Sequence, residues 1–209
     1  IRDGAQVNSG VCIGNCGGYT RQAGAVYISG EDTVLNSVVS NRCTIGDYSN
    51  YGYIGLRSGT FNSNSGDQWM FARGGGRGYY VQYGGTFNRT VGTITLTRPN
   101  NWEEADTDAF QSHSKFIVFG GTATNSGGEL RAFRENMARA EWATAELTVG
   151  GFDTPASFES PYSISMHCPT NTPNLAFLAI NVNSNGLLAA SKISREAASG
   201  TTFNKDDVV

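Results

Sequence analysis

The hydrophobic residues of the N-terminal half occur in short clusters separated by turn-forming residues. In the segment from Gly24 to Gly46, the apolar pieces are too short for helices and are interrupted by Gly, Asn, Ser and Asp. Glycine, asparagine and aspartate tolerate the positive φ angles of tight turns. Such clusters recur at intervals of roughly a dozen residues, which is typical of an all-β domain.

The predicted strand centres are Val11–Ile13, Val26–Ile28, Val34–Val39, Tyr53–Leu56, Trp69–Phe71, Tyr79–Tyr83 and Val91–Leu96. The clusters GDYSNYG, SGTFNSNSG and YGGTFN between them are interpreted as turns.

Two architectures fit residues 1–98. One is a sandwich or jelly roll of antiparallel strands. The other is a right-handed parallel β-helix, in which each coil stacks on the previous one. The order of strand, turn, strand and Asn corner within residues 24–46 favours the β-helix.

The pattern changes near Pro99. Residues 99–114 are polar and acidic, which predicts a linker. Residues 115–209 are predicted to form a C-terminal β-sandwich-like region that begins with the strand Lys115–Gly121. The fold class is therefore all-β, with a β-helix-like or sandwich region followed by a β-rich C-terminal region.

One short helix is expected inside this C-terminal region. Apolar residues at steps of three and four predict a helix from Glu129 to Ala140, whereas residues 141–149 fit either a helix or a strand. Further on, Leu175–Val182 and Leu187–Ser194 flank an Asn-Gly pair, which predicts a β-hairpin.

Composition restricts the class of protein. Charged residues make up 16% of the chain, which also contains 27 glycines; an average soluble protein has about 25% charged residues. Low charge with many small polar residues suits an extracellular or virion-surface β-protein. The net charge of −3 and the absence of a Lys/Arg run argue against nucleic-acid binding. No apolar stretch reaches the roughly 18 residues of a membrane-spanning helix.

The four cysteines are Cys12, Cys16, Cys43 and Cys168. Their even number permits two disulfides, and Cys12 and Cys16 have the spacing of a weak metal-binding pair. No second pair with matching spacing accompanies them, so we expect buried free thiols, no metal and no cofactor.

A candidate ligand site lies in the stretch from Asp67 to Tyr83, where aromatic residues alternate with arginines. Aromatic faces stack on sugar rings, and arginine hydrogen-bonds hydroxyl or acidic groups. The alternative is a packed strand with arginine on its solvent side, and alternate residues of one strand can do both. The candidate ligand-binding residues are Trp69, Arg73, Arg77, Tyr79, Tyr80 and Tyr83.

A second cluster contains carboxylates beside Trp102. A glycosidase needs one carboxyl group as acid and another as base or nucleophile. If the chain is an enzyme, the candidate catalytic residues are Asp67, Glu103 and Glu104. A solvated acidic loop is the favoured interpretation of residues 103–108, because no signature spacing supports a converging acid pair.

The short rungs with Gly and Asn corners in residues 1–97, and the β-rich region that follows, resemble the distal part of a bacteriophage tailspike or tail fibre. The resemblance implies a homotrimer that binds, and sometimes cleaves, bacterial surface polysaccharide. The resemblance lies in the general pattern of short strands and turns over most of the chain. It rests on no specific motif, so it assigns no catalytic residue. The composition also allows another extracellular β-adhesin.

Three functions therefore remain open. The favoured one is a non-enzymatic module of a virion or cell-surface appendage, structural and glycan-binding. The second is a polysaccharide-cleaving enzyme, and the third is a self-assembling coat or filament subunit. We also expect a homo-oligomer, because strands such as Phe116–Phe119 carry few charges to protect exposed edges from pairing.

Overall fold

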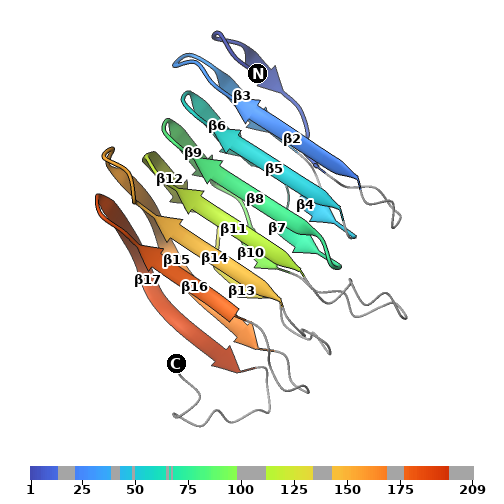
Figure 1. The fold of residues 1–209 in the computed structure, drawn as a ribbon, viewed down its shortest axis with the longest axis vertical. Helices are drawn as coiled ribbons and strands as arrows, with labels where there is room; N and C mark the ends of the chain where they lie inside the picture. The colour runs from blue at the N-terminus through green and yellow to red at the C-terminus, as the bar shows by residue number, and fades with distance from the viewer. Residues whose placement is uncertain are drawn as a thin grey trace.

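The computed structural model describes residues 1–13, 22–38, 43–48, 50–64, 66, 68–97, 112–133, 143–168 and 177–197. All regular secondary structure in these ranges is β-strand, which confirms the all-β prediction. The strands pair in parallel and wind into a solenoid, with successive coils stacked in chain order (Figure 1). Of the two architectures predicted, the parallel β-helix is the one formed.

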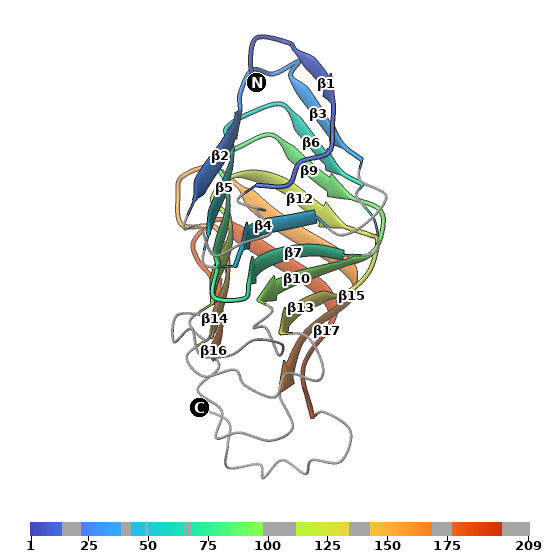
Figure 2. The ribbon, with the colours of Figure 1, turned by 90° about the vertical axis from the view of Figure 1, so that its right-hand side faces the viewer.

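Each coil from β2 to β13 contributes one strand to each of three faces (Figure 2). The first face is a six-stranded sheet. It consists of β2 (Ala23–Ile28), β5 (Tyr51–Leu56), β8 (Arg77–Gln82), β11 (His113–Val118), β14 (Thr144–Val149) and β16 (Phe177–Val182).

The second and third faces belong to one eleven-stranded sheet. The second face starts with β1 (Gln6–Asn8), β3 (Val34–Ser37), β6 (Thr60–Ser63), β9 (Thr86–Arg89) and β12 (Gly121–Asn125). The third starts with β4 (Cys43–Asp47), β7 (Gln68–Arg73), β10 (Thr93–Thr97) and β13 (Leu130–Phe133). The long strands β15 (Ala156–Cys168) and β17 (Gly186–Ala197) run across both faces and join them.

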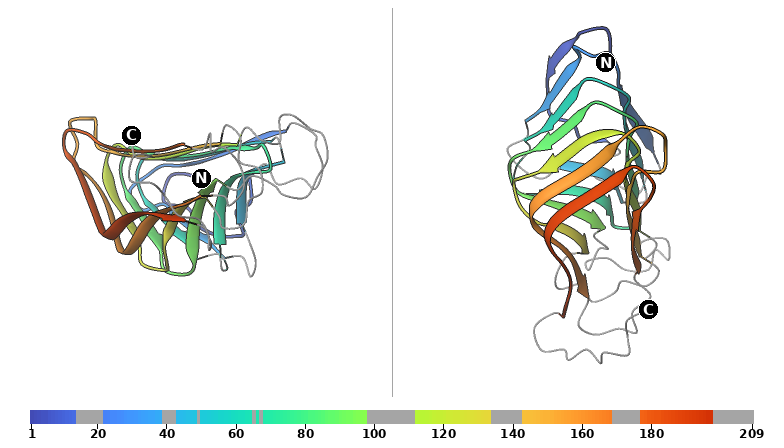
Figure 3. Two further views of the ribbon diagram at one scale, coloured as in Figure 1. Left: turned by 90° about the horizontal axis from the view of Figure 1, so that it is seen from below. Right: turned by 90° about the vertical axis from the view of Figure 1, so that its left-hand side faces the viewer.

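Figure 3 shows the stacked strands from two further sides. Apolar side chains on the inner sides of the faces form a continuous core. On the second face, strand register places Leu35, Phe61, Phe87, Ala123 and Phe158 in one column. Aromatic rings from the three faces meet in the middle coils. Trp69 stacks on Phe87 with ring centroids 5.3 Å apart, and Tyr80 stacks on Phe116 at 4.5 Å. These rings are among the largest fully buried side chains of the protein.

Strands β6 and β9 correct the turn prediction for SGTFNSNSG and YGGTFN. Each places one Phe in the core and an outward-facing Asn in a ladder that links neighbouring coils. The Asn36 amide donates to Asn8 and the Asn62 amide to Asn36, both at 2.7 Å, and the Asn88 amide donates to Asn62 at 3.0 Å. Pairing between coils therefore makes strands of segments whose composition is typical of turns.

The helix prediction for 129–140 is wrong where the structure describes this segment. Leu130–Phe133 is strand β13, which pairs in parallel with β10 and β15. Both Leu130 and Phe133 are buried, so tertiary pairing overrides the local helical periodicity. The remainder, 134–140, lies outside the described residues, and Thr144–Val149 is strand β14.

The predicted hairpin at 175–194 is also wrong. Strands β16 and β17 do form there, but they pair with β14 and β15 of the previous coil. Asn185 has a φ of +59°, the left-handed conformation expected of this Asn-Gly pair. It turns the chain from the first face onto the second, and so makes a solenoid corner.

Strands β11 to β17 extend the same sheets that β1 to β10 begin. Parallel pairing joins β8 to β11 and β10 to β13, on either side of the predicted linker. Residues 99–111 of that linker lie outside the described residues, and its last two residues, His113 and Ser114, belong to β11. The described strands after it continue the solenoid, so they do not form a separate sandwich.

Candidate functional site

The outer surface of the first face is rich in tyrosine. Successive side chains of a strand point to opposite faces of its sheet. In β5 the buried Gly52 therefore separates two outward-facing tyrosines, Tyr51 and Tyr53, and Tyr79 extends outward from β8 beside them. The exposed fraction of Tyr51 is 42%.

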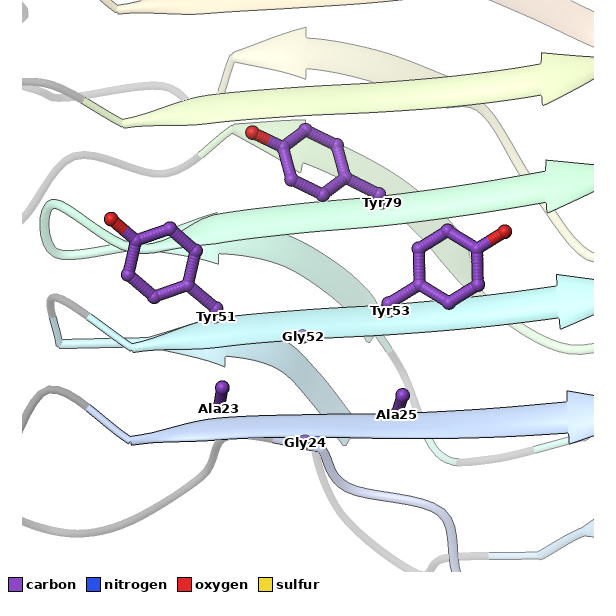
Figure 4. A pocket seen from close by; sticks show the side chains of 7 residues that line it. All are labelled: Ala23, Gly24, Ala25, Tyr51, Gly52, Tyr53 and Tyr79. Atoms are coloured by element: carbon purple, nitrogen blue, oxygen red, sulfur yellow. The ribbon is translucent and has the colours of Figure 1, made fainter.

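These tyrosines surround a shallow hollow on β2, β5 and β8 (Figure 4). Its volume of about 360 Å³ is at the lower end of the range for ligand sites, about 300–1,000 Å³. Its lining consists of Ala23, Gly24, Ala25, Tyr51, Gly52, Tyr53 and Tyr79. The hollow exists because β2 carries alanines in the columns where β5 carries tyrosines: Ala23 pairs with Tyr51, and Ala25 with Tyr53.

Close packing of the third face requires the glycine on the floor. A Cβ at Gly52 would lie 2.5 Å from the Gly46 nitrogen and 2.7 Å from Cγ2 of Ile45. Both of these residues belong to β4, which passes directly behind β5. In register with Gly52 lie Gly24 on one side and Gly78 on the other. A column of small residues thus supports the hollow from inside.

Arg77 lies beside the hollow at the start of β8. Its guanidinium carbon is 5.2 Å from the centroid of the Tyr51 ring, a cation–π arrangement. In the next coil His113 is in register with Arg77, and its Nδ1 is 2.7 Å from Oγ1 of Thr144. Burial lowers the pKa of His113, and the nearby Arg77 charge lowers it further. At neutral pH the imidazole is therefore uncharged.

Further aromatic rings continue from the hollow along the corner that ends the first face. Tyr27 lies 5.4 Å from Tyr53 between ring centroids, and Phe119 lies 5.7 Å from Tyr83 and 4.4 Å from Phe152. Burial raises the pKa of Tyr53, as do the neighbouring Tyr83 and Tyr27. We call Tyr27, Tyr53, Tyr83, Phe119 and Phe152 the aromatic ridge.

The structure places the predicted ligand-binding residues in three regions: the exterior of the first face, the third face and the core. Tyr79 lines the hollow, Arg77 lies beside it, and Tyr83 belongs to the aromatic ridge. Arg73 is on the third face, where its Nε lies 3.4 Å from the Asp47 carboxylate.

Trp69 and Tyr80 require a correction. Both are 0% exposed, so they cannot contact a surface ligand. Trp69 points inward from the third face, and Tyr80 points inward from the first, where its hydroxyl donates to Oε1 of Gln82 at 2.9 Å. Because Tyr79 and Tyr80 are adjacent in one strand, only one of them can face outward.

Sequence reasoning missed Tyr51, Tyr53 and the alanines of β2. The alternation in Tyr51-Gly52-Tyr53 was a usable signal for two tyrosines on one face. A second signal was the repeated TFN motif in Thr60–Asn62 and Thr86–Asn88, where the two asparagines are 26 residues apart. This repeat gives the coil length locally and predicts which residues stack.

The carboxylates proposed for catalysis, Asp67, Glu103 and Glu104, lie outside the described residues. Among the residues that the structure describes, no cluster of His, Cys, Asp or Glu is arranged to hold a metal ion. In the same residues, no helix is long and apolar enough to cross a membrane.

The structure describes the side chains of two of the cysteines, Cys12 and Cys43. Cys43 is buried, Cys12 is exposed, and neither forms a disulfide. The Cys43 thiol donates to the Val11 carbonyl. Its pKa is raised by a hydrogen bond with Cys12 and by burial. The expectation of a buried free thiol is confirmed for Cys43, but Cys12 is on the surface.

No protein-family model matches the chain, and no curated protein or solved structure is significantly similar to it.

Proposed function

We propose that the protein is a non-enzymatic recognition module of a virion or cell-surface appendage and binds a bacterial surface polysaccharide. The observation that carries this proposal is the hollow on the first face, where three tyrosines surround a floor of glycine and alanine. A pyranose ring presents an apolar face that packs on aromatic rings, while its hydroxyl groups can reach the tyrosine hydroxyls.

The rigidity of the site favours binding. The hollow is built on three paired strands, and the tyrosines are anchored by a backbone that packs tightly on β4. A preformed site loses little conformational entropy when it binds a ligand. Small residues on the floor also allow a flat ring to approach the backbone closely.

The location of this module is proposed from composition and fold together. A chain with few charges and many glycines, folded as a parallel solenoid, suits the exterior of a virion or cell. The tyrosine-rich surface would then face the glycans that such a particle meets.

A glycan array with bacterial capsular and O-antigen polysaccharides tests the proposal. The variants Tyr51→Ala, Tyr53→Ala and Tyr79→Ala are expected to weaken binding at least about tenfold, which corresponds to about 1.4 kcal/mol. Tyr162→Ala is the matched control, because Tyr162 is also exposed but lies in β15, away from the first face. Absence of binding by the unmodified protein, or equal binding by all variants, would contradict the proposal.

A further inference from the structure

Arg77 is a cation without a counter-charge at the edge of the hollow. Within the described part of the chain, its guanidinium has the cation–π contact with Tyr51 but no hydrogen bond or ion pair. Its side chain is half-buried. Arg73 and Arg131, also half-buried, are paired with Asp47 and Glu129. Arg77 therefore differs from other arginines in similar surroundings.

The titratable groups near Arg77 either form an ion pair with each other or carry no charge at neutral pH. Lys115 is in register with Tyr79, and its Nζ lies 2.8 Å from the Glu146 carboxylate. That carboxylate also accepts a hydrogen bond from the Thr148 hydroxyl at 2.8 Å. His113, the neighbour of Arg77 in the next coil, is neutral at neutral pH. Among the described residues in the strands of the first face, Arg77 is thus a positive charge without a counter-charge beside an uncharged hollow.

A guanidinium in this position is suited to one kind of group. Its planar N–H donors match the two oxygens of a carboxylate, and such charge-assisted bonds are about twice as strong as neutral ones. The contact with the Tyr51 ring orients the guanidinium before a ligand arrives. Because Tyr51 also lines the hollow, a ring stacked there would place a substituent next to Arg77.

We propose that Arg77 binds the carboxylate of an acidic sugar whose ring stacks in the hollow. The ligand would then be an acidic polysaccharide that contains uronate- or sialate-type residues. This inference rests on the proposed function, because it names the ligand class of the same site. The sugar ring would contribute apolar contact with the tyrosines, and its carboxylate would supply the missing partner of Arg77.

The experiment uses acidic array polysaccharides together with their carboxyl-reduced forms, and neutral and sulfated polysaccharides for comparison. Affinities are measured by titration calorimetry for the unmodified protein, Arg77→Gln, Arg77→Lys and Lys192→Gln. The last is the charge control, because Lys192 is exposed on β17, which does not belong to the first face.

Arg77→Gln is expected to lose roughly ten- to hundredfold affinity for the acidic polysaccharide, the usual effect of a hydrogen bond to a charged group. Arg77→Lys should recover part of it, and Lys192→Gln should bind normally. With the carboxyl-reduced form, unmodified protein and Arg77→Gln should bind alike. Preference for neutral or sulfated polysaccharides, or unchanged binding by Arg77→Gln, would overturn this inference while leaving glycan binding intact. Absence of any glycan binding would instead reject the proposed function.

Discussion

At the scale of single residues, strand alternation separates recognition from stability. In β5, Tyr51 and Tyr53 face solvent and shape the hollow, while Gly52 between them faces β4. In β8, Tyr79 faces outward and Tyr80 is buried in the core. Substitutions at adjacent positions are therefore expected to have different consequences, some on binding and others on folding.

Gly52→Ala should lower the free energy of unfolding by about 1–3 kcal/mol, because the added methyl group overpacks the contact with β4. Urea denaturation measures this change. Ala23→Val serves as the control, since Ala23 is exposed on β2 and is expected to tolerate the larger side chain. Equal stability of Gly52→Ala and the unmodified protein would contradict the close approach of β4 and β5.

His113 should make stability depend on pH. Its pKa in the folded protein is below the ordinary value of 6.5, because burial and Arg77 disfavour the charged form. As the pH falls below about 6.5, the unfolded chain binds the proton first, so the free energy of unfolding decreases. His113→Gln should flatten this part of the profile, as measured by urea denaturation at pH 7.5 and 5.5. An unchanged slope would show that His113 is not held in its neutral form.

At the scale of elements, the sequence identified most strands with several apolar residues, β13 excepted, and missed strands with a single one. Val26–Ile28 and Tyr53–Leu56 were predicted correctly within β2 and β5. Strands β6 and β9 were assigned to turns, because TFNS and TFNR carry a single inward Phe between polar residues. The interactions that stabilise them run between coils, through backbone pairing and the Asn ladder, and local composition does not reveal these contacts.

The Asn ladder gives a prediction for these elements. Asn62→Ala removes the ladder bonds to both Asn36 and Asn88, so the free energy of unfolding should fall by about 1–2 kcal/mol. Thr60→Ala is the matched control in the same strand, because Thr60 also faces outward but has no side-chain hydrogen bond within the described residues. Similar urea midpoints for the two variants would argue against a stabilising ladder.

At the scale of the whole molecule, the site is produced by stacking. Ala23 and Ala25 come from one coil, Tyr51 and Tyr53 from the next, and Tyr79 from the third. These residues become neighbours only once the strand register is known. Register spacing on the first face varies from 26 residues between Tyr51 and Arg77 to 36 between Arg77 and His113. The sequence could therefore predict a tyrosine-rich strand, but the hollow required the three-dimensional register.

Self-association is a further prediction at this scale. The last coil exposes Phe177, Leu187 and Ile193, and its strands β16 and β17 have a neighbouring strand on one side only among the described residues. Such edges favour pairing with another chain, and we expect a homotrimer. Sedimentation equilibrium at micromolar concentration measures this directly. A stable 22.3 kDa monomer would contradict the prediction.

The central claim is that the first face binds carbohydrate in the tyrosine-lined hollow. Hydroxyl-radical footprinting with mass spectrometry tests it most directly, with and without the polysaccharide that binds best on the array. The account predicts reduced oxidation of Tyr51, Tyr53 and Tyr79 in the complex, and unchanged oxidation of the exposed Tyr162. Protection of Tyr162 without protection of these three tyrosines would place the ligand on another face and contradict the claim.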